Sequence, residues 1–326
     1  MKILIDWLSV SFDYDYVGEL YEILGLQDVT TQPMRNRYYQ FGDYFDGVLI
    51  AYNQDEDGRI INTFLDISGR GCRTIEQLSD LTFDWFGFLY SLDEKIKLRK
   101  VHISRIDVAC DLEDDEIPFE RFYKYAFHEA YVCKSKVLPK IVLKREEEIY
   151  FGSSKSDRLL RIYNKAMEQG LPDQYWMRME FQLRNDCAVS FYLNWVLYKD
   201  AGIGYLYRGM MLDYLRFVDP GKLDIKTVKL HNNVRRLPTA KWWSDLLGDA
   251  EKIKQVYLPG KEYTLERLER YAEGNIVSTL KTYAIAHDGD LTKLVKAVEG
   301  CRLNNKQRML LAQLESAKIQ PKETEY

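Results

Sequence analysis

The sequence predicts an α+β protein, with an antiparallel β-sheet core and flanking helices followed by an α-helical C-terminal region. Within the first 185 residues, several short segments alternate apolar and polar side chains with the period of two that is typical of half-buried strands. From about residue 186 onward, apolar residues recur instead at the spacing of amphipathic helices. A chain of 326 residues exceeds one typical domain, so we expect more than one compact unit.

The N-terminal third predicts strands interrupted by two helices. The segment Gly69-Arg70-Gly71 lies between the last expected strand and the second expected helix. A glycine pair beside arginines would let the backbone approach a phosphate, although a tight turn is the commoner explanation for Gly-x-Gly. The expected elements are a strand over 3–12, a helix over 15–25 ending at Gly25, a hairpin within 36–52, a strand over 60–67 and a helix over 74–91.

The middle third repeats this order of elements. The strand, helix, strand, strand sequence occurs roughly in residues 1–67 and again in 101–184. We therefore hypothesise that the core consists of two pseudo-symmetric halves, which the strand order of the folded chain can test. The expected elements are a strand over 101–111, a helix over 118–128 that begins at Pro118, a hairpin from 141–152 and 158–165, and a strand over 175–184.

The remainder of the chain predicts helices. A basic segment over 222–243 contains Trp242-Trp243, which would either stack on unpaired bases or dock a helix on the core. A helix-turn-helix over 290–318 is an alternative to the packing, partner or dimer role that we favour for the last helices. The expected helices span 187–199, 203–217, 265–273, 276–287, 291–299 and 305–318.

These patterns divide the chain into four parts. We expect a β-rich core in 1–185, a helical and basic extension in 186–260, a small helical domain in 261–320 and a disordered tail in 321–326.

Composition excludes several classes of protein. Hydrophobic residues make up 46% of the chain and charged residues 29%, as in ordinary globular proteins. No apolar run is long enough to span a membrane, and Asp6 comes too early for a signal peptide. The five cysteines lie far apart with no Cys-x-x-Cys pair, which favours reduced thiols in a cytoplasmic protein.

Charge is segregated along the chain despite a net charge of only −4. Residues 1–66 carry twelve acids against four Lys or Arg, whereas residues 134–165 carry nine Lys or Arg against four acids. Residues 221–241 carry six Lys or Arg against one acid. The two basic segments are suited to contacts with a nucleic-acid backbone, although a chance excess on solvated loops would give the same counts.

Three of the expected strands each carry a row of ionisable side chains opposite an apolar row. A tyrosine flanked by two cations at strand spacing suits attack on a phosphodiester, because the cations stabilise both the phenolate and the phosphate charge. Aligned in one sheet, these rows would form a site for a divalent metal and a phosphate. Surface ion pairs and a packed tyrosine are the alternative. The rows are Arg161, Tyr163 and Lys165; Arg105, Asp107 and Asp111; and Arg178, Glu180, Gln182 and Arg184.

At these residues the chain resembles the replication initiators of Gram-positive rolling-circle plasmids and the related relaxases of conjugative elements. The shared segments occur in the order of that family and span about residues 5–185. They are Ile5-Asp6-Trp7-Leu8-Ser9-Val10-Ser11-Phe12, Asp66-Ile67-Ser68-Gly69-Arg70-Gly71-Cys72-Arg73, Ser104-Arg105-Ile106-Asp107-Val108-Ala109-Cys110-Asp111, Tyr150-Phe151-Gly152-Ser153, Ser156-Asp157-Arg158-Leu159-Leu160-Arg161-Ile162-Tyr163-Asn164-Lys165 and Trp176-Met177-Arg178-Met179-Glu180-Phe181-Gln182-Leu183-Arg184.

The resemblance implies a site-specific endonuclease that nicks one strand at a double-strand origin, stays linked to the 5′-phosphate and later rejoins the strand. Tyr163 would be the nucleophile, and Asp107 and Glu180 would hold Mg²⁺ or Mn²⁺. Because the chain lacks the His-hydrophobe-His pair of many such nickases, the metal would rest on carboxylates. Phosphate-stabilising residues would be Arg161, Lys165 and Arg178, and DNA-binding residues would be Arg105, Arg158, Lys222, Lys226, Lys229, Arg235, Arg236 and Lys241.

Origin DNA, a host helicase and a second copy of the chain are the partners that the resemblance implies. A conjugative relaxase would use the same chemistry, but the first expected strand begins at residue 3, which favours an initiator. A non-catalytic origin-binding protein of the same fold and a metal-dependent nuclease that uses water are the remaining alternatives.

Overall fold

The structure is a computed structural model of the whole chain, and it falls into two compact units, Met1–Leu258 and Pro259–Tyr326. Lys222, the tail over 321–326 and most of the helices expected over 265–273 and 305–318 lie outside the described residues. The structure describes residues 1–26, 31–34, 38–112, 117–143, 147–171, 173–221, 223–230, 234–248, 251–254, 265, 268–269, 272–303, 307–308 and 311.

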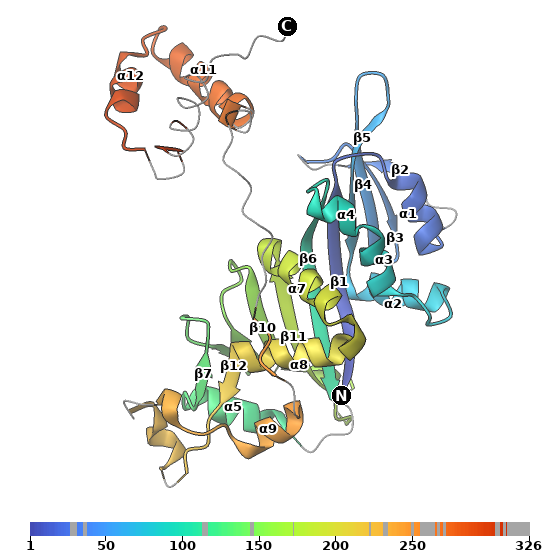
Figure 1. Cartoon of the computed structure of the whole chain (residues 1–326), viewed down its shortest axis with the longest axis vertical. Coiled ribbons are helices and arrows are strands. Elements are labelled where there is room, and N and C mark those ends of the chain that lie inside the picture. Colours follow the sequence, from blue (N-terminus) through green and yellow to red (C-terminus); the bar gives the residue numbers. More distant parts are fainter. Residues whose placement is uncertain are drawn as a thin grey trace, which may run out of the picture. The chain divides into compact units, whose positions relative to one another are not determined.

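An antiparallel sheet dominates the first unit (Figure 1). Among the described residues it has ten strands, in the spatial order β2-β3-β4-β5-β1-β6-β11-β10-β9-β8. The strands are β1 Lys2–Phe12, β2 Thr31–Pro33, β3 Phe41–Phe45, β4 Val48–Gln54, β5 Ile60–Ile67, β6 Val101–Leu112, β8 Lys140–Val142, β9 Glu148–Phe151, β10 Arg158–Asn164 and β11 Met177–Arg184. The predicted α+β class and its antiparallel core are confirmed.

The sheet consists of two halves with the same topology. In each half a long strand leads into a helix, α1 Val17–Leu24 or α5 Phe119–Phe127, and then into a meander whose last strand returns to pair with the first. β5 pairs with β1 in one half, and β11 pairs with β6 in the other. The halves meet where β1 and β6 pair antiparallel, with Trp7 opposite Asp107. This strand order supports the hypothesis of two pseudo-symmetric halves.

One face of the sheet is apolar and is covered by helices. Leu8, Ile106 and Phe181 are fully buried there. α7 Asn185–Leu197 and α8 Gly202–Tyr214 pack over the second half, where Tyr207 of α8 donates a hydrogen bond to the Met179 carbonyl at 2.7 Å (Figure 1). The opposite face carries the ionisable rows, so the alternation read from the sequence places them on one shared surface.

Three predicted elements differ from the structure. The helix expected over 74–91 is two helices, α2 Gly69–Leu78 and α3 Trp85–Ser91, because the chain turns through positive φ at Asp80 and Leu81. Each helix begins after an N-cap residue whose side chain accepts a hydrogen bond from a backbone N–H group. Ser68 caps α2, and Asp84 caps α3. A third short helix, α4 Asp93–Lys97, follows.

The expected strand over 158–165 ends one residue early. The Asn164 side chain accepts a hydrogen bond from the Met167 N–H, which caps a short helix, α6 Lys165–Glu168. Lys165 therefore begins a helix and does not continue the strand. The helix expected over 203–217 likewise ends at Tyr214, and β12 Leu215–Phe217 pairs with β7 Tyr131–Cys133 in a small second sheet.

The basic segment folds against the end of the first unit. It forms two 3₁₀ turns, η2 Ile225–Leu230 and η3 Val234–Arg236, and the helix α9 Lys241–Leu247. Trp243 is fully buried, and its ring lies edge-on to Phe217 at 5.0 Å. The tryptophan pair thus docks a helix on the core.

In the second unit, α11 Val277–Ala286 and α12 Thr292–Glu299 confirm two of the expected helices. A turn of π-helix, Ala272–Ile276, precedes α11. Within the part of the chain that the structure describes, no helix is both long and apolar enough to cross a bilayer.

Close backbone contact fixes α2 against the β3–β4 turn, and this contact can be tested. A Cβ at Gly71 would lie 2.4 Å from the carbonyl oxygen of Gly47, whereas a Cβ at Gly18 of α1 would meet no atom within 4 Å. We expect Gly71→Ala to lower the free energy of unfolding by about 1–3 kcal/mol. The control Gly18→Ala should leave it unchanged or raise it by up to about 1 kcal/mol in urea denaturation. Equal stability of the two variants would contradict this packing.

Candidate active site

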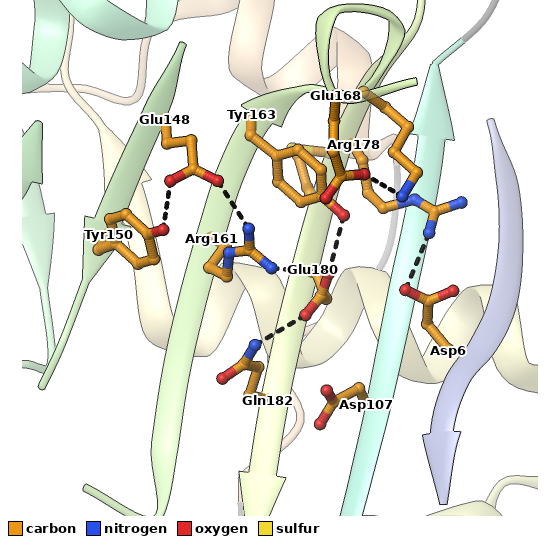
Figure 2. A network of polar contacts seen from close by, with 12 residues as sticks. Asp6, Asp107, Glu148, Tyr150, Arg161, Tyr163, Glu168, Arg178, Glu180 and Gln182 are labelled. Carbon is orange, nitrogen blue, oxygen red and sulfur yellow. Dashed lines mark hydrogen bonds and ion pairs between the residues drawn. The ribbon is translucent and has the colours of Figure 1, made fainter. Parts of the chain in front are cut away.

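Strand register gathers the predicted catalytic residues on the polar face of β10, β11 and β6. Tyr163 pairs with Arg178 and Arg161 with Glu180 across β10 and β11. Gln182 pairs with Asp107 across β11 and β6. Figure 2 shows these side chains on neighbouring strands, where Glu180 contacts Tyr163, Arg161 and Gln182. The phenol, the carboxylates and the guanidinium groups therefore share one site.

Tyr163 is buried within this network. Its side chain is 2% exposed, and its hydroxyl donates a hydrogen bond to Glu180 Oε2 at 3.0 Å. The Arg161 guanidinium lies 4.5 Å from the ring centroid and the Lys165 ammonium 5.7 Å from it. Tyr163 is therefore enclosed, with the cations of Arg161 and Lys165 over its ring.

Electrostatics keep the Tyr163 phenol protonated in the free protein. Burial raises the pKa of the phenol, and the negative charge of Glu180 raises it further. The cations Arg178 and Arg161 lower it, but not enough to offset burial. A nucleophilic role consequently requires a group that accepts the phenolic proton, and Glu180 is already hydrogen-bonded to it.

Arg178 connects β11, the neighbour of the strand that carries Tyr163, to both central strands. Its guanidinium makes two hydrogen bonds to Asp111 of β6, at 2.6 and 2.8 Å, and one to Asp6 of β1 at 2.9 Å. Burial disfavours the charge of Arg178, but its hydrogen bonds to Asp111 and the charge of Asp6 outweigh this effect and raise the pKa. Arg178 is thus a fixed positive charge beside Tyr163.

Arg161 lies between two carboxylates. Its Nη2 donates to Glu148 Oε1 at 2.7 Å, and its Nη1 lies 3.6 Å from Glu180 Oε2. Glu148 also accepts a hydrogen bond from the Tyr150 hydroxyl. Burial and this hydrogen bond raise the pKa of Tyr150 to about 12. Arg161 therefore bridges β9, β10 and β11.

Asp107 is the carboxylate least compensated by its surroundings. It is 2% exposed and accepts two hydrogen bonds from Arg105, at 3.0 and 2.5 Å. Arg105 in turn lies 4.0 Å from the Trp7 ring centroid. Burial raises the pKa of Asp107 to about 7, because the attraction of Arg105 does not offset desolvation and the nearby charges of Glu180 and Asp6.

The chemical type of the side chains around Asp107 and Glu180 suits a divalent cation. Asp107 and Glu180 supply carboxylate oxygens, and their excess negative charge is what a cation would neutralise. Among the described residues no group of three His, Cys, Asp or Glu side chains has the arrangement of a metal site. A bound ion would thus keep several water ligands, as Mg²⁺ does.

Only the second half of the sheet carries a tyrosine at the position of Tyr163. Counting outward from the Trp7–Asp107 pair, Asp66 of β5 takes the place of Glu180 and Ala51 of β4 takes the place of Tyr163. Asp66 accepts hydrogen bonds from Trp7 and Ser9. The first half therefore has one equivalent carboxylate but no phenol.

The other predicted residues lie apart from Tyr163. Arg158 is on the opposite face of the sheet, 3.8 Å from Asp213 and over the Tyr214 ring. In the basic segment, Lys229 contacts Glu129 at 3.8 Å and Lys241 pairs with Asp245 at 2.7 Å. Exposed side chains of this segment are Lys226, Lys229, Arg235, Arg236 and Lys241.

The residue predictions missed several members of the network. Asp6 and Asp111 hold Arg178, Glu148 and Tyr150 hold Arg161, and Gln182 donates to Glu180 at 2.9 Å. Asp111 and Gln182 stood in the polar rows, so extending the site along those rows would have found them. Asp6 lies at a β-bulge between Ile5 and Trp7, which no periodicity reveals.

Comparisons with known proteins identify relatives of this chain in sequence and in fold. The "Putative DNA relaxase NicK" of Bacillus subtilis (strain 168) is 25% identical over 303 residues, which cover 85% of this chain and 79% of that protein. A rolling circle replication initiator protein from Geobacillus stearothermophilus has the same fold, with a TM-score of 0.60 and 23% identity over 78% of this chain and 98% of that one.

Two family models match the chain in sequence order. The model described as "Rolling Circle replication initiation protein N-terminal domain" matches residues 2–91. The model described as "Replication initiation factor" matches residues 101–298, which is more than half of the chain. The chain therefore belongs to the replication initiation factor family of rolling-circle replication proteins.

Proposed function

We propose that this protein nicks one strand of DNA at a double-strand origin through a covalent 5′-phosphotyrosine and later rejoins the strand by transfer. The observation that supports this most directly is the hydrogen bond from the Tyr163 hydroxyl to Glu180, between Arg161 and Arg178. The arrangement supplies a nucleophile, a proton acceptor and two cations for a phosphate. A relaxase of a conjugative element would perform the same step.

In the nicking step the Tyr163 oxygen attacks the scissile phosphorus while Glu180 accepts the phenolic proton. The bond from phosphorus to the 3′-oxygen breaks, and that oxygen takes a proton from water to become a free 3′-OH. Arg161 and Lys165 are now held by Glu148 and Glu168, and they would exchange these partners for phosphate oxygens when DNA binds. Strand transfer reverses the step, with a 3′-OH attacking the phosphotyrosine.

We further propose that Asp107 and Glu180 hold Mg²⁺ or Mn²⁺. When bound, the ion would neutralise charge on the scissile phosphate. Arg105 now compensates Asp107, so it would release that carboxylate to the ion. The exposed cations of η2, η3 and α9 are proposed to hold the DNA backbone, and a host helicase and a second copy of the chain remain predicted partners.

Replacing the nucleophile separates the candidate functions. We expect Tyr163→Phe to abolish the covalent adduct with labelled single-stranded origin DNA in the presence of Mg²⁺ or Mn²⁺, read on denaturing gels. The matched control Tyr44→Phe removes an exposed hydroxyl on β3 and should form the adduct normally. Cleavage without any adduct would support a nuclease that uses water, and binding without cleavage would support a non-catalytic protein.

The raised pKa of Asp107 gives a prediction about pH. Because the folded-state pKa is about 7 against an ordinary 3.8, the stability due to the neutral carboxyl is lost as pH rises toward and through 7. Asp107→Asn mimics the neutral form. It should therefore shift the melting temperature upward relative to the parent by more at about pH 8 than at about pH 5, corresponding to about 1–4 kcal/mol.

The same pair of proteins tests the metal. Mn²⁺ should raise the melting temperature of the parent at the higher pH and have little effect on Asp107→Asn, because the variant lacks one ligand. Equal stabilisation of both proteins by Mn²⁺ would place the ion elsewhere. A pH-independent difference between them would contradict the raised pKa of Asp107.

Salt dependence tests the proposed grip on the backbone. Neutralising both Arg235 and Arg236 with glutamine should weaken binding to duplex origin DNA and reduce the slope of log affinity against log salt by about 1–2. The control double variant, Arg59→Gln with Lys97→Gln, removes two exposed cations elsewhere and should leave the slope unchanged. An unaltered slope in the first variant would exclude these arginines from the DNA contact.

A further inference from the structure

A cavity of about 620 Å³ adjoins the candidate active site and has no role in the chemistry described above. It lies on the polar face where the two halves of the sheet meet. The first half contributes the start of β1 and the start of α2, and the second half contributes α6 and the start of β11. This volume is within the range of about 300–1,000 Å³ that is typical of small-molecule sites.

The cavity begins beside Tyr163. Lys165, which lies over the Tyr163 ring, and Arg178, which pairs with Tyr163 across β10 and β11, both contribute to its wall. A strand of DNA with its phosphate at Tyr163 would therefore reach this cavity with an adjacent nucleotide. The following argument rests on the nicking function proposed above.

Positive charge predominates in the wall. Five cations line the cavity against three carboxylates, those of Asp6, Asp46 and Asp111. Asp6 and Asp111 are committed to Arg178, and Asp46 pairs with Arg70. The Arg70 side chain is 77% exposed, so it can leave Asp46 for an incoming anion at little cost. The cations are Lys2, Arg70, Arg73, Lys165 and Arg178.

An aromatic ring completes the wall. Trp176 lies just before β11 and lines the cavity together with the cations. A cationic wall with one aromatic side chain is the combination that holds unpaired nucleotides, because the cations bind the phosphate and the ring stacks on the base. A purely anionic ligand would not stack on the indole ring, and an apolar ligand would not bind the cations.

Backbone contacts keep the cavity in shape. A Cβ at Gly69 would lie 3.2 Å from both the carbonyl oxygen and Oδ1 of Asp6, so the start of α2 approaches β1 closely. The Arg73 guanidinium donates to the Ile5 carbonyl at 2.6 Å, which fixes α2 on the same strand. Gly69 of the glycine pair noted in the sequence therefore permits this approach, which brings Arg70 to the cavity.

We propose that this cavity binds one unpaired nucleotide of the nicked strand, next to the phosphate that Tyr163 attacks. Trp176 stacks on the base, and Arg70 with Lys2 binds the phosphate on its far side. Because the wall combines residues of both halves, the nucleotide is bound only when β1 and β11 are aligned by Arg178. Duplex DNA does not fit, since stacking on Trp176 requires a base free of its partner.

The test uses the full chain carrying Tyr163→Phe, so that no covalent step contributes. Fluorescence anisotropy measures its binding to a labelled oligothymidylate of about twelve residues. We expect Trp176→Leu to weaken binding about 5- to 150-fold and Trp176→Phe to restore most of it, because phenylalanine still stacks. Arg70→Gln should weaken binding and reduce the salt slope by about 0.7, the value for one single-strand phosphate.

The control is Arg59→Gln, since Arg59 is as exposed as Arg70 and also pairs with an aspartate, but lies outside the cavity. Its binding should match that of the parent. Unchanged binding of the Arg70 and Trp176 variants, or no binding of the oligonucleotide by the parent at low salt, would overturn the assignment.

Nicking is measured separately in protein that retains Tyr163, which distinguishes the two proposals. Adduct formation combined with Arg70-independent binding would remove the cavity from the mechanism and leave the nickase. Arg70-dependent binding without any adduct would leave a single-strand site in a protein that does not nick.

Discussion

The buried ion pair of Arg178 with Asp111 and Asp6 is the interaction on which the site depends. It joins β11, β6 and β1, and so fixes the second half of the sheet to the first. A buried guanidinium without these carboxylates would cost several kcal/mol. Removing Asp111 would take away two of its three hydrogen bonds to carboxylates, and removing Asp6 would take away the third. The same contact sets a positive charge beside Tyr163 and closes one wall of the adjoining cavity. The ion pairs of Arg178 therefore both hold the three strands together and place a positive charge at the candidate site.

Duplicated topology explains why the site lies beside the middle of the sheet. The two central strands β1 and β6 lie in the middle of the sheet, with a hydrogen-bonded strand on each side. Their backbone is therefore held on both sides where it carries the charged side chains of the site. The halves have diverged in chemistry, since Ala51 and Leu49 occupy the places of Tyr163 and Arg161. In the first half, Asp66 accepts hydrogen bonds from Trp7 and Ser9. The Arg105 guanidinium of the second half lies over the Trp7 ring. The first half, which has no tyrosine at the position of Tyr163, thus contacts Arg105 of the second half through Trp7.

Strand periodicity was enough to predict the polar face, because a period of two fixes which side chains share a surface. It placed Tyr163, Arg161, Glu180 and Asp107 correctly together, and the resemblance to rolling-circle initiators suggested roles for them. Periodicity fails where the backbone departs from it. The cap at Asn164 turns Lys165 into a helical residue, and the bulge at Asp6 brings a carboxylate to Arg178. The cavity was beyond prediction for a different reason, since its wall joins Arg70 and Trp176, which are distant in sequence and meet only in the folded sheet.

In the free protein, carboxylates already neutralise the cations that are proposed to bind DNA phosphates. Glu148 holds Arg161, Glu168 holds Lys165 and Asp46 holds Arg70, while the raised pKa of Tyr163 keeps the phenol neutral. On the proposed mechanism, a phosphate must displace these carboxylates before the phenol is reached. A single phosphate competes poorly with a partly buried carboxylate, because the carboxylate is already desolvated and in place. Several phosphates and a stacked base binding together can meet that cost, so the ion pairs would favour an extended unpaired strand over free phosphate or a mononucleotide. On this mechanism the stacked base is what separates an unpaired strand from duplex DNA, because the ion pairs respond to phosphates and both forms of DNA carry them.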